Sequence, residues 1–266
     1  MYAVTMNMRI GVAGDWHGNT PWAVERLNDF HAENISIIMQ LGDFGIWHDE
    51  RGTEFLTQVN QTLLDNGQVL LVTLGNHENY EMVGQLDTLT FGEYEGWQFN
   101  AEFPNILYAT RGQRWEWAGV SFVSLGGAHS INRYDLMEGV DWWAGESMSY
   151  GDIMRTLSGG HADVFLAHDC PTGVELFSDH RDDSKWQQHA LEYAYQSRDD
   201  LRVAVDGVKP GLLFHGHYHH YINTVTDLTD DLGESYQLHS IGLDKDNDAH
   251  NIGILHLPSK EFTLLN

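Results

Sequence analysis

Residues 8–19 read MRIGVAGDWHGN and pass from an apolar run into polar side chains at alternate positions. The run over 10–13 predicts a buried strand, because it is short, apolar and ended by glycine. Asp15, His17 and Asn19 follow it, and side chains two residues apart in an extended chain point to the same side. The stretch therefore indicates either a polar turn after a core strand or a metal or phosphate site at the end of that strand.

Four further apolar runs end in the same kinds of side chain. They are followed by Asp43, by Asn76 and His77, by His168, and by His217 and His219. Ligands of open α/β sheets bind beyond the carboxyl ends of the strands, so neighbouring strands would bring these side chains together. Aspartate, asparagine and histidine suit manganese, iron, zinc or nickel, and there are more of them than the roughly four that one tetrahedral ion needs. The sequence therefore predicts two ions that share a ligand.

The first third of the chain alternates strand and helix patterns. Buried strands are predicted over residues 8–15, 35–43 and 68–78, with a helix that begins at Thr20 and Pro21 and a second helix over 52–67 between them. Thr20 is expected to cap the first helix, and Asn66 and Gly67 to end the second. This alternation favours a parallel sheet with right-handed crossover connections.

The remainder of the chain predicts mainly strands. Short strands are expected over 106–127 with turns at 111–112 and 118–119, further strands over 161–171 and 211–220 and two or three more within 221–258, and one amphipathic helix over 184–200. We expect an α/β fold in which two mixed sheets pack as a sandwich flanked by helices. The chain is expected to form a single domain over residues 1–266.

The composition is strongly acidic, with 14 Lys and Arg against 39 Asp and Glu and a formal net charge of −25. Such a surface repels phosphate backbones and anionic membranes, so neither general nucleic-acid binding nor membrane association is expected. Cys170 is the single cysteine, which excludes an intramolecular disulfide and fits a reducing compartment. No leader pattern and no apolar run of about 18 residues is visible, so a cytoplasmic protein is expected.

The motifs GDWHGN, GDFG, GNHE, the isolated His168 and GHYH, taken in this order, resemble those of the calcineurin-like metallophosphoesterase superfamily. They extend from Asp15 to His219, which is most of the chain. Residues 125–146, LGGAHSINRYDLMEGVDWWAGE, also resemble a stretch of phage and bacterial members. The resemblance implies an α-β-β-α fold and hydrolysis of phosphate esters, as a phosphodiesterase or phosphatase that depends on two metal ions.

The resemblance also implies a role for each motif residue. A first ion would be held by Asp15, His17 and His219, a second by Asn76, His168 and His217, and both by Asp43. A hydroxide that bridges the ions would attack phosphorus, and His77 would protonate the departing alkoxide. Manganese is the expected ion, with iron, nickel, zinc and magnesium as alternatives.

Three further residues are candidates for binding a small phosphorylated substrate. The resemblance implies that Asn19 orients a phosphate oxygen. His129 follows another predicted strand, where it either contacts phosphate or simply ends that strand. Arg133 lies close by in the sequence, and it either clamps an oxyanion with two hydrogen bonds or forms a surface salt bridge.

The sequence departs from the Ser/Thr protein phosphatase branch at Ile46, where that branch has an Asp that supports the acid histidine. Asp49 or Glu50 could take that role here. The departure puts phosphoprotein phosphatase activity in doubt, although it stays an alternative. A nuclease is disfavoured by the net charge of −25. A non-catalytic metal-binding scaffold is disfavoured because all seven candidate ligands and His77 are present.

Overall fold

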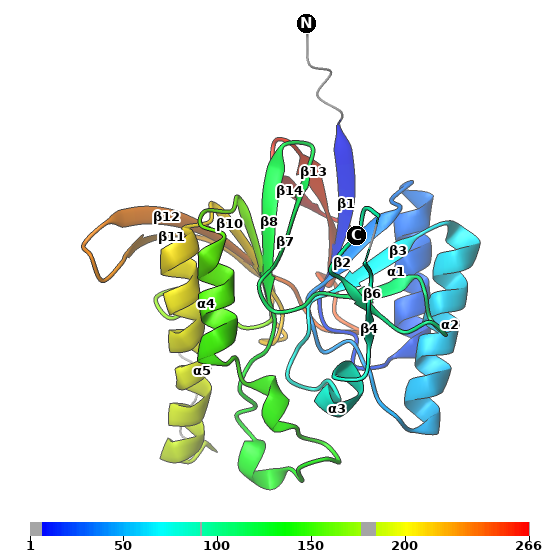
Figure 1. Ribbon diagram of the computed structural model, residues 1–266, viewed down its shortest axis with the longest axis horizontal. Coiled ribbons are helices and arrows are strands. Elements are labelled where there is room, and N and C mark those ends of the chain that lie inside the picture. The colour runs from blue at the N-terminus through cyan, green and yellow to red at the C-terminus, as the bar shows by residue number, and fades with distance from the viewer. Residues whose placement is uncertain (1–6, 91, 177–184, 266) are drawn as a thin grey trace, which may run out of the picture.

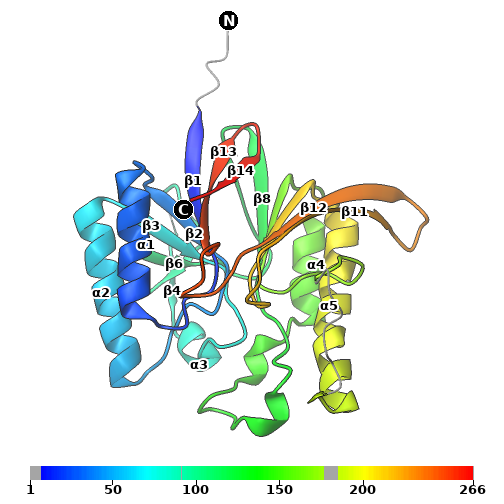
Figure 2. The same cartoon turned by 180° about the vertical axis from the view of Figure 1, so that it is seen from behind.

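The computed structural model describes residues 7–90, 92–176 and 185–265. Two β-sheets pack face to face, and helices cover the outer face of each sheet (Figures 1 and 2). This arrangement confirms the predicted α/β fold with two mixed sheets and flanking helices. Among the helices in these ranges, none combines the length and the apolar character needed to cross a membrane.

The first sheet is built on four parallel strands at its centre. In spatial order it contains β14 (Glu261–Leu264), β13 (Ile252–Leu257), β1 (Met8–Ala13), β2 (Ile37–Gln40), β3 (Val69–Val72), β6 (Ile106–Tyr108), β5 (Gln98–Phe99) and β4 (Asp87–Thr88). Strands β1, β2, β3 and β6 run parallel, and the remaining neighbours pair antiparallel. The carboxyl ends of the first three predicted strands therefore lie at one edge of one sheet.

The second sheet repeats this plan with antiparallel strands at both of its edges. In spatial order it contains β11 (Ile222–Thr229), β12 (Ser235–Gly242), β10 (Leu212–His215), β9 (Val164–Ala167), β8 (Val120–Leu125) and β7 (Gln113–Trp117). Strands β12, β10, β9 and β8 run parallel, whereas β11 and β7 are antiparallel to their neighbours. The runs that precede His168 and His217 are thus adjacent parallel strands.

Helices lie outside the two sheets. On the first sheet these are α1 (Thr20–Ala32) and α2 (Glu50–Asn66), and on the second α4 (Tyr150–Ser158) and α5 (Gln188–Val208) (Figures 1 and 2). Short elements lie in the connections, namely α3 (Tyr80–Val83) and the 3-10 helices η1 (Arg133–Asp135) and η2 (Ala144–Glu146).

Three apolar layers separate these elements. Buried side chains between the sheets include Met39 from β2 and Phe122 and Phe214 from β8 and β10. Leu27 belongs to the layer between the first sheet and its helices, and Phe165 to the layer between the second sheet and its helices. Strands that are buried on both faces explain why the sequence shows near-continuous apolar runs there rather than alternation.

Two predicted helix boundaries need correction. Asn19, and not Thr20, caps α1, because its side-chain oxygen accepts a hydrogen bond from the backbone N–H of Trp22 at 3.3 Å. The helix predicted over 184–200 continues to Val208 as α5, since its buried side extends through Leu201 and Val205. Its predicted start at residue 184 lies outside the described residues. The helices α3 and α4 were not predicted from the sequence.

The predicted end of α2 is confirmed. Gly67 follows Asn66 in the left-handed conformation, with φ of 66°, and its N–H bonds to the last turn of the helix. The turn predicted at 118–119 is also confirmed, because it joins β7 to β8 as a hairpin.

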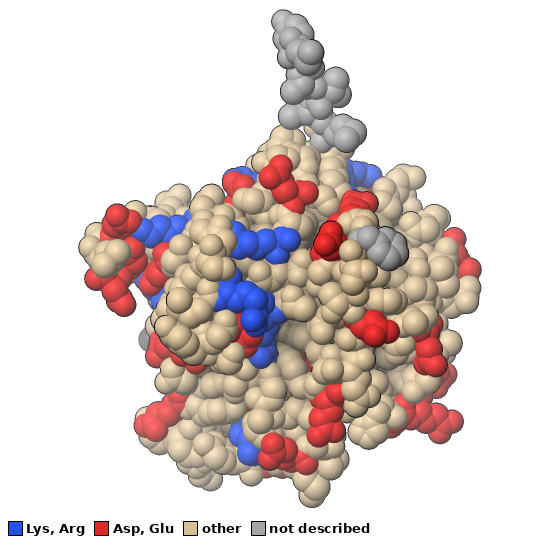
Figure 3. All heavy atoms as spheres, in the orientation of Figure 1, with Lys and Arg blue, Asp and Glu red and all other residues tan. Residues whose placement is uncertain are grey.

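Acidic side chains are spread over the surface, while basic side chains gather near the middle of the face in Figure 3. Several arginines in the region of β7 and α4 bind main-chain carbonyls. Arg114 donates to Thr156 and His161, and Arg155 donates to Arg111. Their guanidinium groups therefore hold connections of this chain together.

We predict that Phe122→Ala lowers the free energy of unfolding by about 3–5 kcal/mol. Phe122 is fully buried between the sheets, where it stacks on Trp115 with ring centroids 5.3 Å apart. The substitution leaves a cavity that the surrounding strands cannot close. Urea unfolding measures the change, with Leu232→Ala as the control because Leu232 is 87% exposed. Equal urea midpoints for the two variants would mean that Phe122 does not stabilise the core between the sheets.

Candidate metal centre

Five strands from both sheets end at one site. Asp15 and His17 follow β1, Asp43 follows β2, Asn76 and His77 follow β3, His168 follows β9, and His217 and His219 follow β10. The loops touch across the two sheets, because the backbone N–H of His217 donates to Asp15 Oδ2 at 3.1 Å. The carboxyl ends of the parallel strands therefore converge as the sequence predicts.

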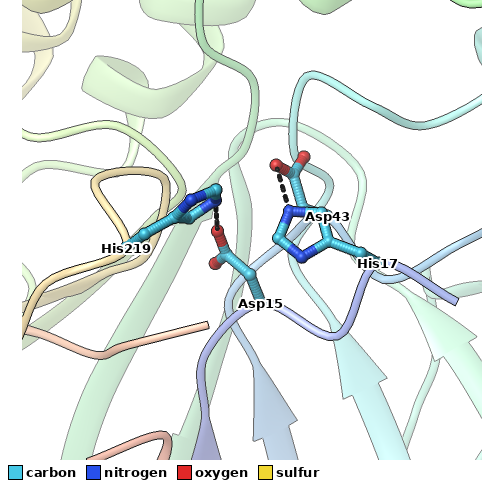
Figure 4. A group of neighbouring side chains, drawn as sticks. All are labelled: Asp15, His17, Asp43 and His219. Carbon is cyan, nitrogen blue, oxygen red and sulfur yellow. Dashed lines mark ion pairs between the residues drawn. The ribbon is translucent and has the colours of Figure 1, made fainter. Parts of the chain in front are cut away.

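The converging side chains form two groups that share Asp43. One ligand atom from each member lies within 4.8 Å of the others, both in the group of Asp15, His17, Asp43 and His219 and in the group of Asp43, His168 and His217. Figure 4 shows the first group, in which Asp15 faces His219 at 3.3 Å and Asp43 faces His17 at 3.5 Å. Either group could hold a metal ion.

The two carboxylate oxygens of Asp43 face different groups. Oδ2 lies 3.5 Å from His17 Nε2, whereas Oδ1 lies 3.3 Å from His168 Nε2. Oδ1 also accepts a hydrogen bond from the backbone N–H of His77 at 2.9 Å. The carboxylate of Asp43 therefore stands at the junction of both groups.

Asn76 joins the second group through its side-chain oxygen, which lies 2.9 Å from His168 Nε2. Its amide nitrogen donates to Ser130 Oγ at 2.9 Å, and the Ser130 hydroxyl donates to Glu146 at 2.5 Å. An ionised carboxylate only accepts hydrogen bonds, so the hydroxyl proton goes to Glu146 and Oγ is left to accept from Asn76. This chain fixes the amide with its oxygen toward the second group.

Hydrogen bonds on the far side of two imidazoles turn their Nε2 atoms toward Asp43. His17 Nδ1 lies 2.9 Å from a carboxylate oxygen of Asp246, and His168 Nδ1 lies 2.7 Å from the main-chain oxygen of Leu41. Both acceptors require a proton on Nδ1, so each Nε2 carries a lone pair in the neutral ring. Such partners orient the histidines of metal sites.

Asp15 and Asp43 are buried, with 0% and 1% of their surface exposed. In the ranges 7–90, 92–176 and 185–265, no Lys or Arg forms an ion pair with either carboxylate. A buried charge without a countercharge is strongly unfavourable, and proteins resolve it by pairing, by protonation or by binding a metal. The donors present, carboxylate oxygens and imidazole nitrogens, fit divalent cations.

The negative charge of the buried carboxylates also affects the pKa values of the nearby imidazoles. Burial lowers the pKa of His17 and His168, but the hydrogen bonds and charge of Asp43, together with the charge of Asp15 and the hydrogen bonds of Asp246 and Leu41, outweigh it and raise these pKa values to about 9 and about 10. For His217, burial dominates and lowers the pKa to about 4. The buried carboxylates thus attract positive charge to the site.

The backbone is strained at four of the candidate ligands. His17, Asp43, His217 and His219 have φ of 45°, 50°, 67° and 52°, in the left-handed region that residues other than glycine rarely adopt. Such a conformation costs about 1–3 kcal/mol per residue and persists only where surrounding structure enforces it. The loops therefore hold these side chains in place against their local preference.

Two glycines allow the loops to approach each other. A Cβ on Gly42 would collide with His168 Nδ1, and a Cβ on Gly216 would collide with Asp15 Oδ1. Gly42 also has φ of 100°, which side chains do not tolerate. The glycines that precede Asp43 and His217 thus reflect close packing between ligand loops.

Glu78 ties the loops after β2 and β3 together. Its buried carboxylate accepts hydrogen bonds from the backbone N–H of Phe44 at 2.7 Å, of Gly45 at 3.3 Å and of Gly75. Burial and then the charge of Asp43 raise its pKa to about 7. Glu78 belongs to the GNHE motif, but its part in holding the loops was not predicted.

His77 lies beside both groups, at the edge of a cavity. Its ring centroid is 6.1 Å from that of His17, and its main-chain oxygen accepts from Trp47 Nε1 at 2.9 Å. Within the part of the chain that the structure describes, no carboxylate forms an ion pair with its ring. Asp49, considered as its support, instead caps α2 by accepting from the N–H of Gly52 at 2.7 Å. Glu50 is exposed.

The three candidate substrate residues bind the chain itself. Asn19 caps α1, and its amide nitrogen donates to Asp246 at 2.6 Å. His129 is buried and stacks on Tyr193 with centroids 4.0 Å apart. The guanidinium of Arg133 lies 3.4 Å from the ring centroid of Trp142. Their role in substrate binding stays a prediction.

The roles of Asp246, Ser130 and Glu146 around the site were not predicted from the sequence. Asp246 follows β12, which runs parallel to β10, so it is a sixth case of a polar residue beyond a strand end. That signal was present in the sequence. Ser130 and Glu146 lie in the long connection between β8 and α4, where no periodic pattern marks them.

Comparisons with known proteins agree with this fold. The sequence model described as calcineurin-like phosphoesterase matches residues 8–221. The solved structure of TT1561 of Thermus thermophilus is similar, with a TM-score of 0.57 and 10% identity over 97% of this chain and 98% of that chain. A dimetal phosphatase from Danio rerio is similar, with a TM-score of 0.50 and 12% identity over 93% of this chain and 91% of that chain. No curated protein sequence matches the chain significantly.

We predict that Glu78→Gln lowers the free energy of unfolding by about 1–3 kcal/mol, because the new amide group turns a donor toward backbone donors. Glu81→Gln on the exposed side of α3 is the matched control. Denaturant unfolding above the pKa of Glu78 measures both variants. Similar stability of the two would mean that Glu78 does not hold the loops.

Proposed function

Because the chain belongs to the calcineurin-like phosphoesterase family, we propose that it hydrolyses phosphate esters with the help of two divalent metal ions. The observation that carries the proposal is the position of Asp43 between two groups of ligand atoms, each compact enough to hold one ion. Two groups that share a carboxylate are what a dimetal hydrolase needs.

The proposed ligands divide between the two ions. The first would be held by Asp15, His17, Asp43 and His219, and the second by Asp43, Asn76, His168 and His217. The fit rests on the two buried carboxylates, which lack Lys or Arg partners among the described residues, and on Nε2 atoms that face them. When bound, such a pair of ions lowers the pKa of a coordinated water and neutralises charge on the phosphoryl oxygens.

His77 is the proposed general acid. Its backbone N–H is fixed by Asp43 and its main-chain oxygen by Trp47, so its main chain is anchored beside both groups. From there the ring can give its proton to the oxygen that leaves phosphorus. The charge of the protonated imidazole also favours the approach of an anionic ester.

The substrate proposed is a small phosphate ester. The net charge of −25 disfavours long polyanions, whereas a small ester needs positive charge only at the site itself. Manganese as the ion, a cytoplasmic location, a single domain over 1–266 and a phage or bacterial type of member stay predictions.

Hydrolysis should depend on added metal and on Asp43. The test compares p-nitrophenyl phosphate, bis-p-nitrophenyl phosphate, cyclic nucleotides and a phosphopeptide, each with Mn, Ni, Zn or Mg added after chelation. Asp43→Asn should reduce the rate by more than about 100-fold, because even the outer partners of metal ligands contribute about 10- to 100-fold. Asp65→Asn, an exposed position on α2, should match the wild type. Undiminished hydrolysis by the chelated protein would refute the proposal.

Glu146→Gln should weaken retention of one of the two ions by about 10- to 100-fold. A glutamine can donate to Ser130, which frees the hydroxyl proton to turn toward Asn76 and reverses the amide. Metal content per chain after dialysis against graded chelator measures the effect. Glu138→Gln, an exposed residue of the same connection, is the control. Equal metal content in the two variants would mean that Glu146 does not orient the Asn76 amide for metal binding.

A further inference from the structure

A cavity of about 200 Å³ lies on the helix side of the first sheet, between α2, α3 and the segment that follows β5. Among the described residues, none of the seven candidate metal ligands lines it. An apolar cavity of roughly 150 Å³ binds benzene, so this one has room for a single ring with a small substituent. The apolar part of its wall is formed by Ile46, Leu56, Met82, Leu86, Phe99 and Phe103.

The hydroxyl of Tyr108 faces this cavity without a protein partner. Tyr108 lines the cavity and is 1% exposed, and no residue in the ranges 7–90, 92–176 and 185–265 forms a hydrogen bond with its hydroxyl. The hydroxyl is not one of the fully enclosed polar atoms of the described chain that lack a partner, so it reaches open space. The cavity is the open space that Tyr108 lines. A nearly buried hydroxyl without a hydrogen bond is unfavourable, so a ligand that supplies one is favoured.

The surroundings of Tyr108 select the kind of ligand. Burial and then the charge of Glu78 raise the pKa of Tyr108, so its hydroxyl keeps its proton and can donate it to an acceptor. Asp87 lines the cavity at its exposed mouth, and none of the described Lys and Arg residues does. An anion therefore finds no countercharge there. A neutral molecule with an acceptor oxygen, such as a carbonyl, matches the wall.

The wall of the cavity is already in place without a ligand. Ile46 and Leu56 are each 2% exposed, and the main-chain oxygen of Ile46 accepts a hydrogen bond from the N–H of Asn79 at 3.0 Å. The ring of Tyr108 packs near Phe44, with ring centroids 6.4 Å apart. A preformed wall needs little reorganisation when a ring binds against it.

We propose that this cavity is a second binding site, separate from the candidate metal centre, for a neutral single-ring compound that carries one carbonyl oxygen. The carbonyl accepts the hydrogen bond of Tyr108, and the ring lies against the apolar wall. Ile46 belongs to the loop that carries Asp43, so a bound ring contacts a loop that supplies a candidate metal ligand. The inference does not depend on the proposed hydrolysis.

The test is calorimetric binding of two matched probes to the full chain. Acetophenone carries the carbonyl, and α-methylstyrene has the same shape with a methylene group in place of the oxygen. Tyr108→Phe should weaken acetophenone binding by about 2- to 13-fold, the range for one net hydrogen bond, and should leave α-methylstyrene binding unchanged. Its melting temperature should match the wild type, because the hydroxyl binds no described residue. Tyr150→Phe is the control, since Tyr150 is 76% exposed.

A second pair of variants assigns the probes to this cavity. Ala101 is exposed and lines the cavity, so Ala101→Trp should block entry and abolish binding of both probes. Glu102→Trp, at an exposed neighbour that does not line the cavity, should bind like the wild type. Removal of metal by a chelator should also leave binding unchanged.

Three results would overturn the inference. The first is that acetophenone does not bind the wild type, which would mean that water alone meets the Tyr108 hydroxyl. The second is that Tyr108→Phe affects both probes alike or that Ala101→Trp binds them as well as Glu102→Trp does. The third is that chelation abolishes binding, which would place acetophenone at the metal centre. Hydrolysis of phosphate esters tests only the proposed function and does not enter these outcomes.

Discussion

Two buried carboxylates that lack Lys or Arg partners among the described residues impose the main constraint on this molecule. Asp15 and Asp43 are almost fully removed from water, and their neighbours are imidazoles. Their charge raises the pKa of His17 and His168 and makes the site attractive to cations. Removing charge from water is unfavourable, so the surrounding fold must supply the free energy that keeps them there.

That free energy comes from the apolar layers, and the strained loops depend on it. Four candidate ligands adopt left-handed backbone conformations, and Gly42 and Gly216 let neighbouring loops touch. Neither feature is stable in an isolated segment. Both persist because the two sheets are fixed against each other by a buried core that includes Met39 and Phe122. The site is therefore a property of the sandwich as a whole.

Hydrogen bonds from residues around the site fix the orientation of the side chains that meet there. Asp246 and the main-chain oxygen of Leu41 direct two imidazoles, while Ser130 and Glu146 direct the amide of Asn76. These partners come from segments far apart in the chain. Their common effect is to aim ligand atoms inward, which is the condition for binding metal with a defined geometry.

The alternation of apolar runs with helical segments was enough to predict two mixed sheets, and the residue types after five strand ends were enough to predict which side chains meet around Asp43. These features are local, because strand periodicity and the chemistry of a side chain are written in consecutive residues. Only the tertiary structure determined which residue caps α1 and which backbone groups Glu78 binds. The same holds for the hydrogen bonds that Asp246 and Ser130 form with residues of the site. Hydrogen bonds between loops depend on how the sheets are oriented, and no short stretch of sequence encodes that orientation.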